Sequence, residues 1–250
     1  MSYNVLADGL ATADKFPQCS ERELDFNFRA PRVIQEVIDS EAGIICFQEM
    51  NHIEDYYEEK LKELGFQLIR NKQESKLKNH EIAIAIKTSQ YTLLDFELIN
   101  LNDVASLYDN DPDFKKDNQA MLCLLRHSKT QKNIVVGNAR LHWNPEYDYV
   151  KFAQAHFVVD KTAEYMRMNG VRSGSFSEKT QTISNALPLI LCGDFNALPV
   201  SSALSAFYGE NIEDESSSWK IPSDLEKNKF TAFGRYKTTN KLYKRKLLLK

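Results

Sequence analysis

Apolar residues along the chain follow two spacings, one typical of strands and the other of helices. Short apolar runs with almost no charged residue predict buried strands, and alternating runs predict half-buried ones. Stretches with apolar residues three and four positions apart predict amphipathic helices. The expected strands are residues 3–6, 43–47, 82–86, 91–99, 119–125, 133–136 and 187–192, and the expected helices are residues 21–40, 53–64, 149–168 and 201–207.

The order of these elements predicts the α/β class, because strands and helices are mixed along the whole chain. The strands at 119–125 and 133–136 are expected to form a hairpin around a polar turn. Residues 169–185 are polar and rich in Gly, Ser and Thr, and residues 209–218 are acidic and rich in Ser. We expect loops there, and neither is long enough to separate two domains.

The composition excludes two classes of protein. The 250 residues are 42% hydrophobic and include 14 Phe and 11 Tyr, too many for a disordered polymer. No apolar run approaches the roughly 20 residues of a membrane-spanning helix. The first residues lack the basic and apolar segments of a secretory signal. We therefore expect a cytoplasmic protein with no membrane partner, and the nucleus is the alternative.

The cysteines and the charges give weaker evidence about function than the composition does. Cys19, Cys46, Cys123 and Cys192 are scattered without a CxxC spacing, which favours structural thiols over a zinc or redox site. The net charge is −3, yet residues 227–250 hold nine Lys or Arg and no acidic residue. We interpret this segment as a solvated end of the chain, and attraction to nucleic acid is the alternative.

The clearest candidate chemistry follows the strand at 187–192. Asp194 and Asn196 stand two positions apart after Gly193, so both side chains can face one side at the carboxyl end of a strand. Ligands collect at such strand ends in α/β sheets. A carboxylate can activate water, and an amide can hold a phosphate oxygen. The alternative is that both residues make only the local hydrogen bonds of a turn.

Three weaker patterns lie beside other expected strands. Glu49 follows the apolar run at 43–47 and suits a hard cation such as Mg²⁺, although a surface carboxylate leaves the same pattern. Asn4 can offer a neutral oxygen to the same metal or to its water. Arg140 follows the strand at 133–136 and can bind phosphate. Close by, Trp143 can stack on a base, or it can simply be packed.

Together these segments resemble the endonuclease/exonuclease/phosphatase superfamily of Mg²⁺-dependent phosphodiesterases. Within it, the chain is similar to the nocturnin and carbon-catabolite-repressor deadenylase branch. The matching stretches are residues 2–10, 45–49, 117–118, 142–147 and 192–196. The resemblance implies a two-sheet α/β sandwich of the DNase I-like kind over residues 1–236, followed by a divergent or disordered basic tail at 237–250.

The resemblance also implies a role for each matched residue. Glu49 would ligate catalytic Mg²⁺, with Asn4 on the metal or its water. Asp194 would orient or deprotonate the attacking water, and Asn196 would hold the scissile phosphate. The further residues expected to support or contact the substrate are Asn118, Asn138, Arg140, His142, Trp143 and Pro145.

The chain departs from the family pattern at three places. Arg140 stands where the family has a His, and it keeps the positive charge. His80 and Glu81 stand where the family usually has Asp-Gly. Family members also continue past a Phe-Thr stretch like residues 230–231 into a further strand and a Ser-Asp-His motif. We expect those last strands, and the Asp and His that they supply to the site, to be missing from this chain.

The resemblance favours a Mg²⁺-dependent 3′–5′ exoribonuclease or deadenylase that acts on the 3′ end of poly(A) and releases 5′-AMP. One alternative is a phosphatase or phosphodiesterase that acts on NADP(H) or 2′,5′-oligoadenylate. The other is a catalytically inactive relative that binds RNA. The sequence does not point to a particular partner in a deadenylase complex.

Overall fold

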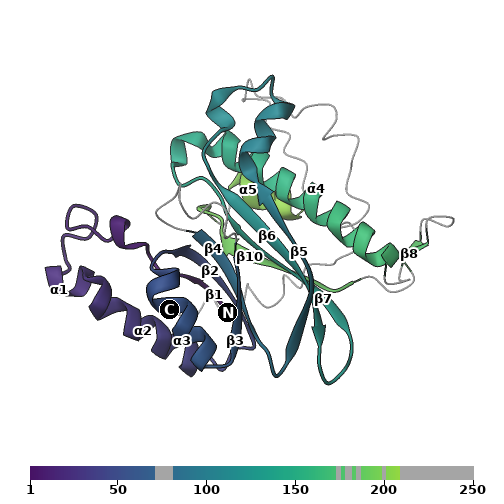
Figure 1. The fold of residues 1–250 in the computed structure, drawn as a ribbon. Coiled ribbons are helices and arrows are strands. Elements are labelled where there is room, and N and C mark those ends of the chain that lie inside the picture. The colour runs from purple at the N-terminus through teal and green to yellow at the C-terminus, as the bar shows by residue number, and fades with distance from the viewer. Residues whose placement is uncertain (71–80, 173–175, 178–181, 184–186, 199–200, 209–250) are drawn as a thin grey trace, which may run out of the picture.

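Two four-stranded sheets lie face to face at the centre of the molecule, with helices on both outer sides (Figure 1). The computed structural model describes residues 1–70, 81–172, 176–177, 182–183, 187–198 and 201–208, and every structural statement below concerns these residues. The arrangement confirms the predicted two-sheet α/β sandwich.

The first sheet has the strand order β1-β2-β4-β3. Its strands are β1 (Ser2–Asn4), β2 (Ile44–Met50), β3 (Phe66–Arg70) and β4 (Glu81–Lys87). β1 runs parallel to β2, whereas β4 is antiparallel to both β2 and β3. The register between β2 and β4 shifts between Phe47 and Met50, so the end of β2 that carries Glu49 is irregular.

The second sheet has the strand order β10-β7-β6-β5. Its strands are β5 (Tyr91–Asn100), β6 (Gln119–His127), β7 (Asn133–Arg140) and β10 (Leu189–Asp194). β5, β6 and β7 are antiparallel neighbours, and β10 runs parallel to β7. The predicted hairpin of β6 and β7 is confirmed.

The second strand of this hairpin is longer than predicted. The expectation that Asn138 and Arg140 follow the strand is wrong, because β7 continues through both residues. The polar side chain of Asn138 does not end the strand, since it finds hydrogen-bond partners inside the sandwich.

Helices cover the outer face of each sheet (Figure 1). α1 (Glu21–Leu24), α2 (Phe26–Asp39) and α3 (Glu58–Glu63) lie with the first sheet, and α4 (Asp148–Arg172) and α5 (Ser202–Tyr208) lie with the second. The helix predicted at 21–40 is split at Asp25, whose side chain accepts a hydrogen bond from the Asn27 amide and so caps α2. The helix predicted at 53–64 begins with a π-helical turn, η2 (Ile53–Tyr57).

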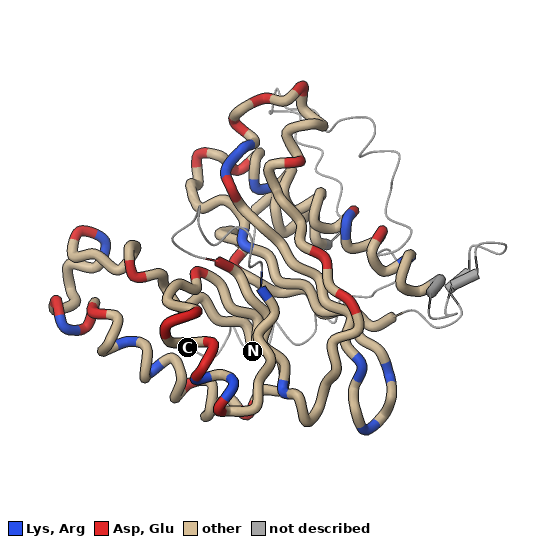
Figure 2. The backbone as a smooth tube through the Cα atoms, in the orientation of Figure 1, with Lys and Arg blue, Asp and Glu red and all other residues tan. Residues whose placement is uncertain are grey.

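The sandwich has three apolar layers. One joins α2 and α3 to the first sheet, and another joins α4 and α5 to the second. The layer between the sheets includes Ile84, Ile86, Met121, Leu125 and Val136. Charged residues lie mainly on the helices and connections, while the central strands are largely free of charge (Figure 2).

Some expectations fall outside this structure. The described part of the chain has no helix that is both long and apolar enough to cross a membrane. Residues 209–250, which include the expected acidic loop and basic tail, lie outside the described residues. The loop expected at 169–185 is wrong where it is described, because α4 continues to Arg172 and β8 (Phe176–Ser177) pairs with β9 (Thr182–Ile183).

Candidate active site

Four polar side chains meet at one end of the sandwich, and each comes from the carboxyl end of a different strand. Asn4 ends β1, Glu49 is the last residue but one of β2, Arg140 ends β7 and Asp194 ends β10. They converge because β1 is parallel to β2, β10 is parallel to β7, and β1 lies against β10. The site therefore takes its residues from both sheets.

Glu49 is a buried, ionised carboxylate. Its backbone is left-handed, with φ 57°, which interrupts the strand. Its Oε1 accepts a hydrogen bond from the guanidinium of Arg140 at 2.7 Å, and its Oε2 accepts one from the Ala7 amide at 3.4 Å. Burial raises the pKa of Glu49, but the hydrogen bond from Asn4 and the charge of Arg140 outweigh it, so the pKa lies below its usual value. A carboxylate must be ionised in this way to bind a metal.

Asp194 is held by hydrogen bonds from two directions. Its Oδ2 accepts from Nδ2 of Asn4 at 2.9 Å, and its Oδ1 accepts from the Asn196 backbone amide at 3.1 Å. The second bond is the local turn bond that the sequence left open, and the first joins residues that are 190 positions apart. Both oxygens keep lone pairs that can accept a proton from water.

The two asparagines of this group have their side chains fixed. The Oδ1 of Asn4 accepts from the Leu6 amide at 2.9 Å, so Asn4 offers its Nδ2 to the carboxylate of Asp194. A direct bond from Asn4 to a metal stays a prediction. Asn196 has a left-handed backbone, with φ 46°, and its Nδ2 donates to the Leu141 carbonyl at 2.9 Å.

Asn138 lies between the two sheets, behind the strand ends. Its Nδ2 donates to the carbonyls of Phe47 at 2.8 Å and Ala83 at 3.0 Å, and its Oδ1 accepts from Nε2 of Gln48 at 2.8 Å. The side chain thereby ties β7 to β2 and β4. Any support that Asn138 gives to a phosphate site is indirect in this arrangement, and that role stays a prediction.

Aromatic rings border the site after β7. The ring centroid of His142 lies 6.0 Å from that of Trp143 and 5.4 Å from that of Tyr147. His142 is buried, whereas Trp143 is 65% exposed. Pro145 begins the short turn η5 (Pro145–Tyr147) that follows them. An exposed indole beside a buried imidazole offers a flat surface on which a base can stack.

Asn118 is brought to the same region by a side-chain relay. Gln154 of α4 accepts a hydrogen bond from the His142 amide at 2.9 Å and donates one to Oδ1 of Asn118 at 3.2 Å. All three residues are buried. The helix therefore fixes the position of both predicted substrate-contacting residues.

Three cations surround His142. Burial lowers the pKa of His142, and the charges of Lys116, Lys151 and Arg140 lower it further. The imidazole is therefore neutral at pH 7 and is better suited to stacking than to acting as an acid. Lys151 is buried, and its Nζ lies 3.3 Å from the Asn196 carbonyl. Each of the three cations also lies within 4 Å of a carboxylate, Lys116 near Asp113, Lys151 near Asp148 and Arg140 near Glu49.

The carboxylate oxygens fit Mg²⁺. The described residues contain no group of three or more His, Cys, Asp and Glu that could hold a metal by itself. Mg²⁺ does not need one, because it keeps several waters and uses one or two carboxylates. Glu49 is the direct ligand that fits, since it is charged and fixed in direction. Arg140 is bound to the same carboxylate, so its positive charge disfavours a metal cation at that oxygen.

Two of the three departures from the family pattern concern residues outside the described chain. These are His80 and the terminal segment expected to lack the Asp and His. Glu81, the other residue at the Asp-Gly position, begins β4 and lies 3.8 Å from Arg70. Arg140, the third departure, is bound to Glu49.

Sequence reasoning missed several residues that hold the site together. Gln48 was not singled out, although alternation along β2 places it on the same face as Cys46, toward the other sheet. Lys116, Lys151 and Gln154 gave no signal in the sequence, because they reach the site from a loop and from α4 only in the folded chain.

Comparisons with known proteins agree with this fold. No family model matches the chain. The chain is 31% identical over 236 residues to the CCR4-Not complex 3′-5′-exoribonuclease subunit Ccr4 of Yarrowia lipolytica, covering 83% of this chain and 33% of that protein. It is 26% identical to the CCR4-NOT transcription complex subunit 6-like-B of Xenopus laevis, covering 88% of this chain and 44% of that protein.

Two solved structures share the fold. ANGEL2, a 2′,3′-cyclic phosphatase in complex with adenosine-2′,3′-vanadate, superposes with a TM-score of 0.65 at 24% identity, over 83% of this chain and 56% of that one. The human Nocturnin catalytic domain with bound sulfate gives a TM-score of 0.59 at 19% identity, over 82% of this chain and 66% of that one.

The two sheets and the helices on their outer sides form the sandwich that these solved structures share. The chain belongs to the endonuclease/exonuclease/phosphatase superfamily; it is similar in sequence to Ccr4 and shares its fold with ANGEL2 and nocturnin. It spans between 33% and 44% of the length of the two curated relatives, so their activities as whole proteins do not transfer directly.

Proposed function

We propose that the chain is a Mg²⁺-dependent phosphodiester hydrolase, and specifically a 3′–5′ exoribonuclease that shortens poly(A) RNA and releases 5′-AMP. The observation that carries this proposal is the group of two carboxylates, Glu49 and Asp194, linked by Asn4 and faced by Arg140. The similarity to a relative named as a 3′-5′-exoribonuclease subunit favours RNA as the substrate.

The two carboxylates have different roles in this proposal, one in binding the metal and the other in accepting a proton. Mg²⁺ held by Glu49 would polarise a phosphoryl oxygen and stabilise the leaving oxygen. Asp194 accepts the proton of the attacking water, because its two oxygens are already aligned by Asn4 and Asn196. The Asn196 side chain lies beside Asp194, where it can contact the scissile phosphate.

Arg140 takes the place of the phosphate-binding His of the family. Its side chain is 14% exposed and its Nη2 donates to Glu49, so the proposed contact with a phosphate oxygen comes from the exposed part of the guanidinium. Lys116 and Lys151 act on the neighbouring His142, although each lies beside a carboxylate of its own. A guanidinium suits this role because its planar fork matches two phosphate oxygens.

The base of the terminal nucleotide is expected to stack near Trp143. This side chain is 65% exposed, and the neighbouring His142 is neutral at pH 7. Stacking of this kind tolerates any base, so preference for adenine must come from edge contacts that add to it.

The test is shortening of a 5′-labelled oligo(A) by the purified chain, with Mg²⁺ and with EDTA. Asp194→Asn removes the proposed base, and Asp39→Asn, an exposed carboxylate at the end of α2, is the matched control. Parallel reactions contain NADP⁺ with a phosphate readout and an oligonucleotide ending in a 2′,3′-cyclic phosphate.

We expect Mg²⁺-dependent release of 5′-AMP by the parent and by Asp39→Asn, and loss of at least about 100-fold in Asp194→Asn. Phosphate release from NADP⁺ without shortening of oligo(A) would indicate that the substrate is a small nucleotide. Opening of the cyclic phosphate without shortening would indicate that the substrate is the phosphorylated end of an RNA. Folded protein with no turnover of any substrate would overturn the proposed hydrolase.

A further inference from the structure

The segment that leaves β1, residues 5–8, carries contacts that shape the site. Leu6 has a left-handed backbone, with φ 57°, which is uncommon for a side chain of this size. The Leu6 amide donates to Oδ1 of Asn4, and the next amide, that of Ala7, donates to Oε2 of Glu49. This exit segment therefore orients Asn4 and Glu49 together.

The side chain of Arg29, on α2, binds backbone carbonyls of the exit segment. One guanidinium nitrogen donates to the carbonyls of Val5 at 3.2 Å and Leu6 at 2.8 Å. The other terminal nitrogen lies 3.3 Å from Oδ1 of Asp8, and Nε donates to the Leu24 carbonyl at 3.0 Å. The side chain is 16% exposed. Such a set of bonds holds the strained turn in one conformation.

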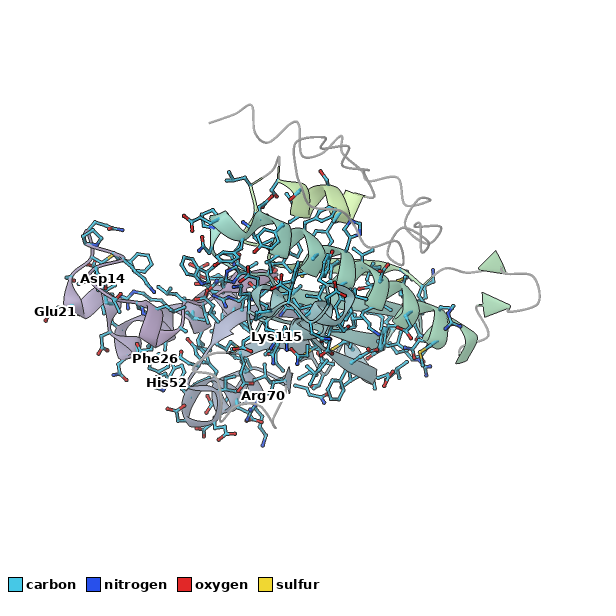
Figure 3. The ribbon with its side chains drawn as sticks, turned by 90° about the horizontal axis from the view of Figure 1, so that it is seen from above. Asp14, Glu21, Phe26, His52, Arg70 and Lys115 are labelled. Carbon is cyan, nitrogen blue, oxygen red and sulfur yellow. The ribbon has the colours of Figure 1, made fainter. Side chains whose placement is uncertain are left out.

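The same segment is enclosed from a second side by His52. Its ring stacks on Phe26 at a centroid distance of 4.0 Å, beside the start of α2 (Figure 3). Its Nε2 lies 3.9 Å from Oδ2 of Asp8. Asp8 is therefore held between Arg29 and His52, and the exit segment has little freedom to move away from the site.

We propose that Arg29 is a positioning residue for the metal and water site. By binding the carbonyls of residues 5 and 6, Arg29 fixes the direction of the Asn4 amide, and through Asn4 and the Ala7 amide it sets the placement of Glu49 and Asp194. The inference rests on the proposed function, because it assigns Arg29 a role in forming the Mg²⁺ site that Glu49 provides.

A lysine cannot replace this arginine. The guanidinium reaches three different oxygen atoms of the exit segment in fixed directions, and an ammonium offers a single point charge on a flexible stem. Both Arg29→Gln and Arg29→Lys should therefore loosen the site, even though the lysine variant keeps the charge. If one variant does not fold, the other still reports on the proposal.

The experiment measures metal binding separately from activity. Free Mn²⁺ is followed by its paramagnetic resonance signal during titration of the parent, Arg29→Gln, Arg29→Lys and Glu49→Gln. Arg32→Gln is the matched control, because Arg32 lies on the same helix, is exposed and donates to the Phe28 carbonyl of its own helix. Thermal unfolding identifies a temperature at which each variant is folded, and kcat and KM for oligo(A) are measured there.

Loss of a residue that orients metal ligands typically costs about 10–100-fold in metal affinity or activity. We expect both Arg29 variants to weaken Mn²⁺ binding and to lower kcat within this range, while KM stays within about threefold because the proposed phosphate and base contacts come from the second sheet. Exchange of the Leu6 and Ala7 amide hydrogens should also become faster. Arg32→Gln should behave as the parent does.

Two results would overturn the inference, and they are distinguishable. Folded Arg29 variants that bind Mn²⁺ as tightly as the parent does would exclude the positioning role and leave the proposed function intact. A parent protein whose Mn²⁺ binding is unchanged by Glu49→Gln would overturn the proposed metal site, and the role of Arg29 with it.

Discussion

Replacing Arg140 with glutamine tests how the site holds a buried negative charge. The guanidinium donates to Oε1 of Glu49 at 2.7 Å, and the two side chains are 14% and 8% exposed. Arg140→Gln keeps a polar side chain with a hydrogen-bond donor, but this side chain is shorter and carries no charge. The carboxylate of Glu49 is then left buried with no cation bound to it.

The expected cost follows from the geometry of the pair. Two unit charges 2.7 Å apart attract by about 6 kcal/mol at an effective dielectric constant of about 20, and desolvation of the two groups offsets most of this. Removing one partner of a buried pair costs about 3–5 kcal/mol. Because the shorter glutamine does not restore the hydrogen bond to Glu49, we expect a loss within this range at neutral pH.

The pH dependence of this loss has a definite sign. The pKa of Glu49 lies below its usual value in the folded parent, so ionised Glu49 stabilises the fold above that usual pKa, and the contribution is lost as pH falls through the folded pKa. Without Arg140, burial is the stronger influence and raises the pKa of Glu49. The difference between parent and variant should therefore be largest near about pH 7 and shrink toward about pH 4.

Urea unfolding in EDTA at several pH values measures this difference. Arg126→Gln is the matched control, because Arg126 lies on the neighbouring strand β6, is exposed and donates to the Asn133 side chain. A difference that stays the same from neutral to acidic pH, or one no larger than that of the control, would refute the assignment of Glu49 as a buried charge stabilised by Arg140.

Three further predictions concern the frame of the site. Gly193→Ala should lower the free energy of unfolding by at least about 3 kcal/mol, because Gly193 has φ +150° and an added Cβ would lie 1.9 Å from the Ala139 carbonyl oxygen. Thermal unfolding measures this loss, and Gly9→Ala, which has open space around it, is the control. Asn138→Ala should lose about 2–4 kcal/mol in urea unfolding, because it removes a donor from two carbonyls and an acceptor from the buried Gln48 side chain. Trp143→Ala should raise KM for oligo(A) by about 5–10-fold with kcat and the melting temperature unchanged, because the exposed indole provides stacking and little packing; a fall in kcat alone would contradict this.

The sequence predicted the positions of most strand ends near the site, but it did not predict the contacts that the side chains make there. Glu49 and Asp194 each follow an apolar run, and the parallel pairs β1–β2 and β7–β10 bring the strand ends together. Asn4 lies inside the strand predicted at 3–6, whereas β1 ends at Asn4. Arg140 joins them only because β7 is longer than its apolar run. The strand β3 was missed because Phe66–Arg70 is short and contains two polar residues, Gln67 and Arg70.

The sequence could not predict the interior bridge of Asn138. A polar residue after an apolar run usually marks the end of a strand, and the strand was therefore predicted to stop at residue 136. Alternation continued to residue 140 would place Asn138 on the same face as Val136, which lies between the sheets. The partner Gln48 is 90 positions away, and its proximity follows only from the way in which the two sheets pack.

The long span of the Asn4–Asp194 hydrogen bond has a consequence for how the protein acquires its chemistry. The bond joins residues 190 positions apart, and the Glu49–Arg140 pair joins residues 91 positions apart. Contacts between such distant segments form slowly in folding, because the intervening chain must first lose its entropy. We therefore expect the first and second sheets to form earlier than the site between them. The rate at which metal binding recovers after dilution from urea would then report the rate at which the two sheets dock. This recovery should be slower than the return of secondary structure.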